Sequence, residues 1–186
     1  LVYTNVLIKN WESFVKLGIR RVDMSGFLHH NVRLDFPISM GDYKFSSDPS
    51  KPVIIHLQSV PGEYGNPSAR QQFIAGQRQL LATPFNEFER SIRAQLTRLL
   101  SPGGFDASED ILGITVNRWP HGYAYGYDPE SDQVAFDVDS WPEKKQHWKT
   151  ASKQFGNISI ASTDSASNAM SEAAIVEADR AVRDIR

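Results

Sequence analysis

The stretch FGNISIASTDSASNAMSEAAIVEADRAVRDI, residues 155–185, predicts a strand, a polar turn and a helix that close the fold. Ile158 and Ile160 alternate with small side chains, which is the period of a half-buried or central strand. Asn168 and Ser171 are both suited to begin the helix as its N-cap. The apolar residues that follow share one helical stripe: Ala174, Ile175, Ala178, Ala181, Val182 and Ile185.

Asp164 lies just past the expected strand, and the helix begins a few residues later. This arrangement offers a carboxylate to ribose or ribityl hydroxyls and backbone N–H groups to a carbonyl or a phosphate. The alternative is an ordinary polar turn in a closing βα unit. Taken alone, these residues favour the ordinary turn.

The composition indicates a folded protein, with 40% hydrophobic and 23% charged residues among 186. That length suffices for one domain with a core or for part of a larger one. The net charge of -2 gives no reason to expect nucleic acid or an anionic membrane as a partner. The absence of cysteine excludes disulfides, thiolate metal sites and cysteine nucleophiles. The sequence contains no apolar run long enough to span a membrane and no visible signal peptide.

The sequence upstream of residue 155 predicts antiparallel strands with helices between them, because no helix-length connection separates the middle strands. Residues 128–149 read as a charged linker with weak structure. The abrupt apolar start suggests a missing N-terminal portion, in which case open strand edges require a hetero- or homo-oligomeric partner.

The predicted domains are 1–109 and 110–186. The predicted strands are 1–8, 31–38, 53–60 and 110–117, and the predicted helices are 12–17, 68–82 and 84–100.

An aromatic run, RWPHGYAYGY at 118–127, is the densest chemical feature of the sequence. In an extended conformation the alternating tyrosines Tyr123, Tyr125 and Tyr127 would all lie on one side. Such rings can form a flat wall against a planar group or a cage for a cation. Core packing beneath a loop is an equal alternative.

Several catalytic motifs are absent from the sequence, including GxGxxG, the Walker loop, HExxH and GxSxG. The adjacent pair His29 and His30 cannot place both rings on one face of a helix or strand, so it is a weak metal site. No metal ligands are assigned. The chain by itself does not carry an enzyme's full apparatus.

Five segments together resemble the C-terminal part of the spermidine dehydrogenase-like flavoproteins, within the flavin-containing amine oxidoreductases. The most specific segment is ITVNRWPHGYAYGYDP at 114–129, and the closing stretch 155–182 is shared with many flavin amine oxidases. The remaining segments occur in the family's order: NVLIKNW at 5–11, LDFPISMGDY at 34–43 and LLATPFNEFERSIRAQLTRLLSPGGFD at 80–106.

The resemblance implies an α/β (α+β) fold: the C-terminal part of a Rossmann-type FAD-binding fold plus a substrate domain. It implies that residues 1–109 are mainly that substrate domain, an antiparallel sheet with a helical cover. The glycine-rich βαβ unit that holds the ADP part of FAD is absent, consistent with its lying on a separate or missing N-terminal FAD-binding chain. The implied reaction is hydride transfer from the carbon beside a neutral amine to FAD, which gives an imine.

The resemblance also assigns roles to individual residues. Asp164 and Ser165 match the acidic turn beside the cofactor, and Ser171, Glu172 and Ala173 match the helix start whose N–H groups point at the flavin ring. The aromatic run matches the substrate pocket, with His121 and Tyr123 as catalytic residues. The substrate-binding residues are Trp119, Tyr125 and Met170.

One departure concerns the loop 166–170, where relatives carry aromatic residues and this chain carries Ala166-Ser167-Asn168-Ala169-Met170. The change puts spermidine itself in doubt as the substrate. It also leaves open the alternative of a non-catalytic binding or scaffolding subunit derived from the same fold. Members of the family also hold a haem in some cases, for which His29 or His30 would be the first ligands to test, and the resemblance implies a periplasmic location.

Overall fold

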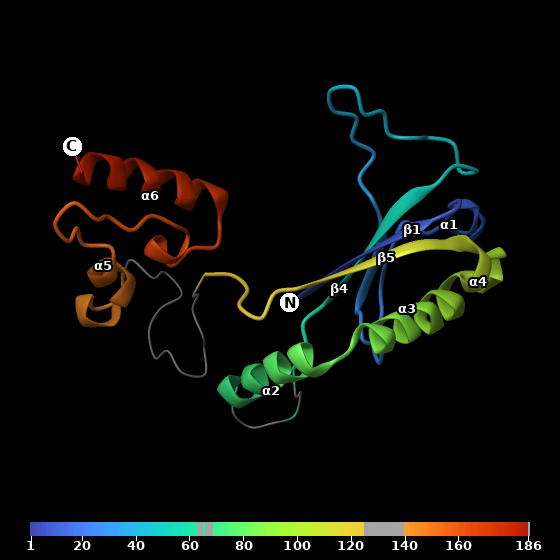
Figure 1. Cartoon of the computed structure of the whole chain (residues 1–186), viewed down its shortest axis with the longest axis horizontal. Helices are drawn as coiled ribbons and strands as arrows, with labels where there is room; N and C mark the ends of the chain where they lie inside the picture. Colours follow the sequence, from blue (N-terminus) through green and yellow to red (C-terminus); the bar gives the residue numbers. More distant parts are fainter. Residues whose placement is uncertain (63–64, 66–68, 125–139, 186) are drawn as a thin grey trace. The chain divides into compact units, whose positions relative to one another are not determined.

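The computed structural model describes residues 1–62, 65, 69–124 and 140–185 of the chain (Figure 1). The chain divides into two compact units, Leu1–His121 and Gly122–Arg186, and each is considered by itself. The predicted mixture of helices and antiparallel strands is confirmed. Within the described residues, no helix combines the length and the apolar character needed to cross a membrane.

The first unit is built on a five-stranded antiparallel sheet with the strand order β2-β3-β4-β1-β5. Because β5 pairs with β1 along nearly its whole length, the unit continues to His121 instead of ending at residue 109. The strands are β1 Val2–Ile8, β2 Arg21–Asp23, β3 Asn31–Leu34, β4 Val53–Ser59 and β5 Ile111–Arg118.

Alternation along the central strands decides which face of the sheet is buried. Val6 on β1 lies opposite Ile55 on β4 and Ile114 on β5, so apolar side chains form continuous rows across the strands. Val6 and Ile55 are fully buried, whereas the neighbouring residue Ile54 points to the other face and is 40% exposed. The sheet therefore packs one face against helices and leaves the other open.

The helix α3 covers the buried face and runs along β1 and β5 in Figure 1. Its residues Phe88, Ile92, Leu96 and Leu100 recur at every fourth position and are fully buried. The helices of this unit are α1 Glu12–Leu17, α2 Ala69–Ala82, α3 Phe85–Leu100, the 3-10 turn η1 Ser101–Gly103 and α4 Ala107–Asp110.

The strand predicted over residues 31–38 is shorter than its apolar alternation suggests. It ends at Leu34, and Phe36 and Ile38 are 53% and 61% exposed. Pro37 lacks the N–H group that a paired strand would use, so the ladder with β4 stops just before it. Residues beyond the strand form a long loop that returns to β4.

Gly103 lies where η1 touches α1, and the contact leaves no space for a side chain. A Cβ atom built on Gly103 would lie 2.7 Å from the carbonyl oxygen of Ser13 and 2.9 Å from its Cα. We expect Gly103→Ala to lower the free energy of unfolding by about 1–2 kcal/mol, because the two backbones must separate. Gly113→Ala is the control, since nothing lies within 4 Å of a Cβ atom built at that position. Urea denaturation measures both variants, and the control should change the free energy of unfolding by less than about 0.5 kcal/mol. Equal effects of the two substitutions would contradict this packing.

The second unit contains helices and turns, and no strand among its described residues. The strand predicted from Ile158 and Ile160 is wrong. Only an isolated bridge joins Phe155 to Ile158, around a tight turn in which Gly156 has a positive φ of 57°. The elements are η3 Glu143–Lys145, α5 His147–Ala151, η4 Asp164–Ala166 and α6 Ser171–Asp184.

The apolar stripe predicted for α6 largely faces solvent in this unit. Ile175, Val182 and Ile185 are 69%, 45% and 56% exposed, and only Ala181 of the stripe is buried. The side of α6 that faces the rest of the unit carries charged residues instead, as described below. The periodicity predicted the helix correctly but not the direction of its apolar side.

Candidate functional site

The aromatic run after β5 is anchored at its first residues. Arg118 donates to the carbonyl oxygen of Thr83 at 3.0 Å, and its guanidinium lies 5.3 Å from the centroid of the Phe88 ring. The N–H of Trp119 donates to the carbonyl oxygen of Leu1, and the terminal ammonium of Leu1 donates to the carbonyl oxygen of Trp119, each at 2.8 Å. These contacts hold the Trp119 backbone while its side chain remains 55% exposed.

His121 closes the first unit and is exposed. The side-chain amide of Gln77 on α2 donates to the carbonyl oxygen of Pro120 at 3.2 Å. The same amide nitrogen lies 3.3 Å from Nε2 of His121. The structure thus brings Trp119 and His121 to the same end of β5, next to α2.

Tyr123 and Met170 belong to the second unit, and both are exposed, by 71% and 56%. Tyr123 has a positive φ of 59°, so the chain is not extended there and the predicted alternation of tyrosine rings is wrong at its first member. Tyr125 lies outside the described residues.

Two predicted cofactor-binding residues occupy the turn η4. Ser165 is buried, and its hydroxyl donates to the carbonyl oxygen of Ile160 at 3.4 Å. Asp164 is exposed, and its backbone N–H donates to Oγ of Ser162 at 3.1 Å. The turn therefore fixes the backbone at Asp164 and leaves its carboxylate accessible.

The helix α6 begins without a side-chain cap. Met170 is its N-cap in extended conformation, so the prediction of Asn168 or Ser171 at that position is wrong. The N–H of Ala174 makes the first bond of the helix, to the carbonyl oxygen of Met170 at 3.2 Å. The N–H groups of the preceding residues, 171–173, form the positive end of the helix dipole and receive no N-cap side chain.

A cavity of about 680 Å³ lies within the second unit and brings two of these residues together. Ser165 from η4 and Ala173 from α6 both line it, whereas Asp164, Ser171 and Glu172 do not. Its walls also carry charged side chains of both signs, among them Lys153 and Glu177. The cavity is therefore suited to a polar ligand.

Arg180 organises this unit and was not predicted. Its guanidinium binds the carboxylates of Glu177 at 2.9 Å and Asp184 at 2.6 Å. It also donates to the carbonyl oxygens of Ser152 at 3.0 Å and Ile160 at 2.5 Å. One side chain thus joins α6 to the end of α5 and to the segment before η4. The spacing of the acidic residues at three and four positions from Arg180 is the signal that sequence reasoning missed.

The two histidines of the adjacent pair in the first unit differ in burial, because His29 is buried and His30 is half-buried. His29 is fully buried, and its Nε2 lies 2.9 Å from Oγ1 of Thr4. Burial lowers the pKa of His29 from 6.5 to about 4, with a smaller contribution from the adjacent His30. The described residues include no group of three or more acidic, histidine or cysteine side chains placed to hold a metal ion.

No protein-family model matches the sequence, and no curated protein matches it significantly.

Proposed function

We propose that this chain is part of a flavin-dependent amine oxidoreductase acting on a polyamine-like amine, completed by an N-terminal FAD-binding chain. The sequence resemblance motivates the proposal. The observation that carries it is the five-stranded antiparallel sheet with helices packed on one face. That is the architecture which the resemblance implies for the substrate domain. A Rossmann-type origin of the second unit belongs to the same proposal.

The second unit has groups that fit the cofactor side of such a site. When bound, FAD would accept a hydride from the carbon beside the amine nitrogen, leaving an imine that hydrolyses. The exposed carboxylate of Asp164 is free to accept hydrogen bonds from ribityl or ribose hydroxyls. The start of α6 places partial positive charge at residues 171–173, which stabilises a nearby negative charge.

The substrate side of the proposal rests on the aromatic run. Exposed Trp119 and Tyr123 rings offer π-faces that attract an alkylammonium group. His121 is the proposed base, which takes a proton from the substrate ammonium so that the amine reacts in its neutral form. The side-chain amide nitrogen of Gln77, which lies 3.3 Å from Nε2 of His121, can orient the His121 ring.

Absorption spectroscopy of the purified protein, with mass spectrometry of any accompanying polypeptide, tests the proposal. We expect flavin bands together with a second polypeptide that supplies the ADP-binding part. A colourless preparation that contains the partner would favour a binding or scaffolding subunit instead.

The site assignment predicts the effect of a double substitution in the complete enzyme. Asp164→Ala combined with Tyr123→Phe should reduce amine turnover at least tenfold, about 1.4 kcal/mol, because the carboxylate proposed to contact the cofactor and the hydroxyl of the proposed catalytic tyrosine are both lost. The matched control is Asp42→Ala with Tyr43→Phe, an exposed aspartate–tyrosine pair in the loop after β3. Full turnover in the first double variant would refute the assigned residues.

A further inference from the structure

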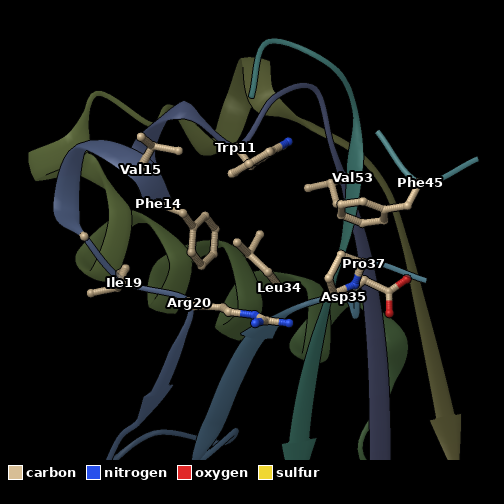
Figure 2. Close-up of a pocket in the computed structure, with 11 residues that line it drawn as sticks. Trp11, Phe14, Val15, Ile19, Arg20, Leu34, Asp35, Pro37, Phe45 and Val53 are labelled. Atoms are coloured by element: carbon tan, nitrogen blue, oxygen red, sulfur yellow. The ribbon is translucent and has the colours of Figure 1, made fainter. Parts of the chain in front are cut away.

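A second cavity, of about 340 Å³, lies wholly within the first unit, where α1 meets the ends of β3 and β4 (Figure 2). None of the residues assigned above to flavin or amine binding lines it. Its volume lies at the lower end of the range found for small-molecule sites. The principal lining residues are Trp11, Phe14, Leu34, Pro37, Phe45 and Val53.

The walls of this cavity are aromatic and aliphatic. Phe14 is 1% exposed and Val53 is 8% exposed, so both are fixed by the core behind them. Figure 2 shows the Trp11 ring at the top of the cavity, with Phe14 on one side and Phe45, from the loop after β3, on the other. The N–H of Trp11 is held by the carbonyl oxygen of Pro49 at 2.9 Å, which ties that loop to the start of α1. The cavity is therefore formed by packed elements, and the face of the Trp11 ring is available to stack on a ring of a bound molecule.

Two charged residues, Asp35 and Arg20, are among those that line the cavity, and the carboxylate of Asp35 already has a partner outside it. The Asp35 carboxylate points away from Phe14 in Figure 2, toward the open face of the sheet. There its Oδ1 lies 3.0 Å from Nε2 of His56, which in turn contacts Asn5 at 2.6 Å through Nδ1. The carboxylate is thus committed to a polar cluster outside the cavity.

Arg20 is the other charged residue, and it lies along the lower edge of the cavity beneath Leu34. The part of the chain that the structure describes provides no carboxylate within ion-pair distance of its guanidinium. Its backbone carbonyl oxygen accepts the N–H of Leu34 at 2.9 Å, so the residue is held at the edge of the sheet. The cavity therefore combines an apolar interior with one available cation at its rim.

We propose that this cavity binds a small molecule with a flat apolar body and a single carboxylate. The body lies between the aromatic walls, and the carboxylate accepts hydrogen bonds from the Arg20 guanidinium, whose planar fork matches its geometry. The site is separate from the proposed amine and flavin residues. Its occupancy therefore does not depend on whether the protein oxidises amines.

Calorimetric titration of the purified protein, with any polypeptide that accompanies it, tests the site with two probes of the same shape. We expect 2-naphthoate to bind more tightly than the neutral 2-naphthamide. Arg20→Gln should weaken 2-naphthoate about tenfold and change 2-naphthamide less than about twofold, because only the charged hydrogen bonds are lost. Arg21→Gln is the matched control, since that neighbouring arginine does not line the cavity and pairs with Asp23; it should leave both affinities unchanged.

A second substitution tests the position of the site independently of charge. Val15 lines the cavity and is 53% exposed, so Val15→Trp can fill the opening without disturbing the core. We expect it to weaken both probes more than about tenfold. Val182→Trp on α6 is the control, and thermal melting monitors folding of each variant. The proposal is overturned if 2-naphthoate does not bind, if Arg20→Gln weakens both probes equally, or if binding survives Val15→Trp.

Discussion

Replacement of Leu96 by alanine should lower the free energy of unfolding by about 3–4 kcal/mol. Leu96 is fully buried on α3, where its side chain fills the space between the helix and the sheet. Truncation removes apolar contacts and leaves a cavity that the surrounding strands cannot close. Urea denaturation followed by circular dichroism measures the change, and an unaltered m-value would show that the same surface is exposed on unfolding.

Leu81→Ala provides the matched comparison because it makes the same chemical change on an exposed helical residue. Leu81 lies on α2 and is 59% exposed, so we expect a loss of less than about 0.5 kcal/mol. Similar losses for the two leucines would mean that α3 does not form the central contact of the core.

Lowering the pH from 6.5 to about 4 should remove about 3 kcal/mol of stability through His29 alone. The pKa of His29 is lowered to about 4 in the folded protein, whereas an exposed histidine in the unfolded chain has a pKa near 6.5. Between these values the unfolded chain takes up a proton that the folded protein excludes. The contribution of His29 to the free energy of unfolding is therefore present in full above about pH 6.5 and is lost as the pH falls toward 4.

Denaturation curves across this pH range for His29→Gln measure the effect. The variant should lose most of the slope of stability against pH, because its buried side chain does not titrate. Thr4→Ser keeps the hydroxyl that faces Nε2 of His29. Its stability should therefore depend on pH as steeply as that of the parent protein, with the free energy of unfolding shifted by a constant amount. An unchanged slope in His29→Gln would contradict the assignment. Three carboxyls whose pKa is lowered by hydrogen bonds lose their contribution only below about pH 3.8: Asp23, Asp48 and Asp106.

The first unit could largely be predicted from its sequence because its apolar residues follow the period of each element. The alternation of Val53, Ile55 and Leu57 identifies β4 and its buried face. The spacing of Ile92 and Leu96 identifies the side of α3 that packs on the sheet. In such elements hydrophobic burial dominates the local energetics, so pattern and structure agree.

The second unit could not be predicted in the same way because a charged side chain organises it. Ile158 and Ile160 have a strand-like alternation, yet they are 64% and 54% exposed and pair with no neighbouring strand in the described chain. Arg180 binds the backbone of that segment instead, and a hydrogen-bonding network of this kind has no periodic signature.

The candidate sites were predictable only where neighbouring residues in sequence form them. Asp164 and the start of α6 are close in the chain, and their proximity was expected. The cavity beside α1 was not, because Trp11, Leu34 and Phe45 reach it from three separate segments. A contact of that kind depends on the tertiary fold, which local spacing does not encode.

The position of β1 determines the order in which the first unit can assemble. It is early in the chain yet lies inside the sheet, between β4 and β5. Its hydrogen bonds on one side come from β5, and the bonds between Leu1 and Trp119 span 118 residues. During synthesis, β1 therefore emerges before either neighbour, gains β4 as a partner once residues 53–59 have been made, and lacks its second partner until β5 follows. Pairing at this separation requires a large loop to close, which slows folding and makes completion of the sheet a late event.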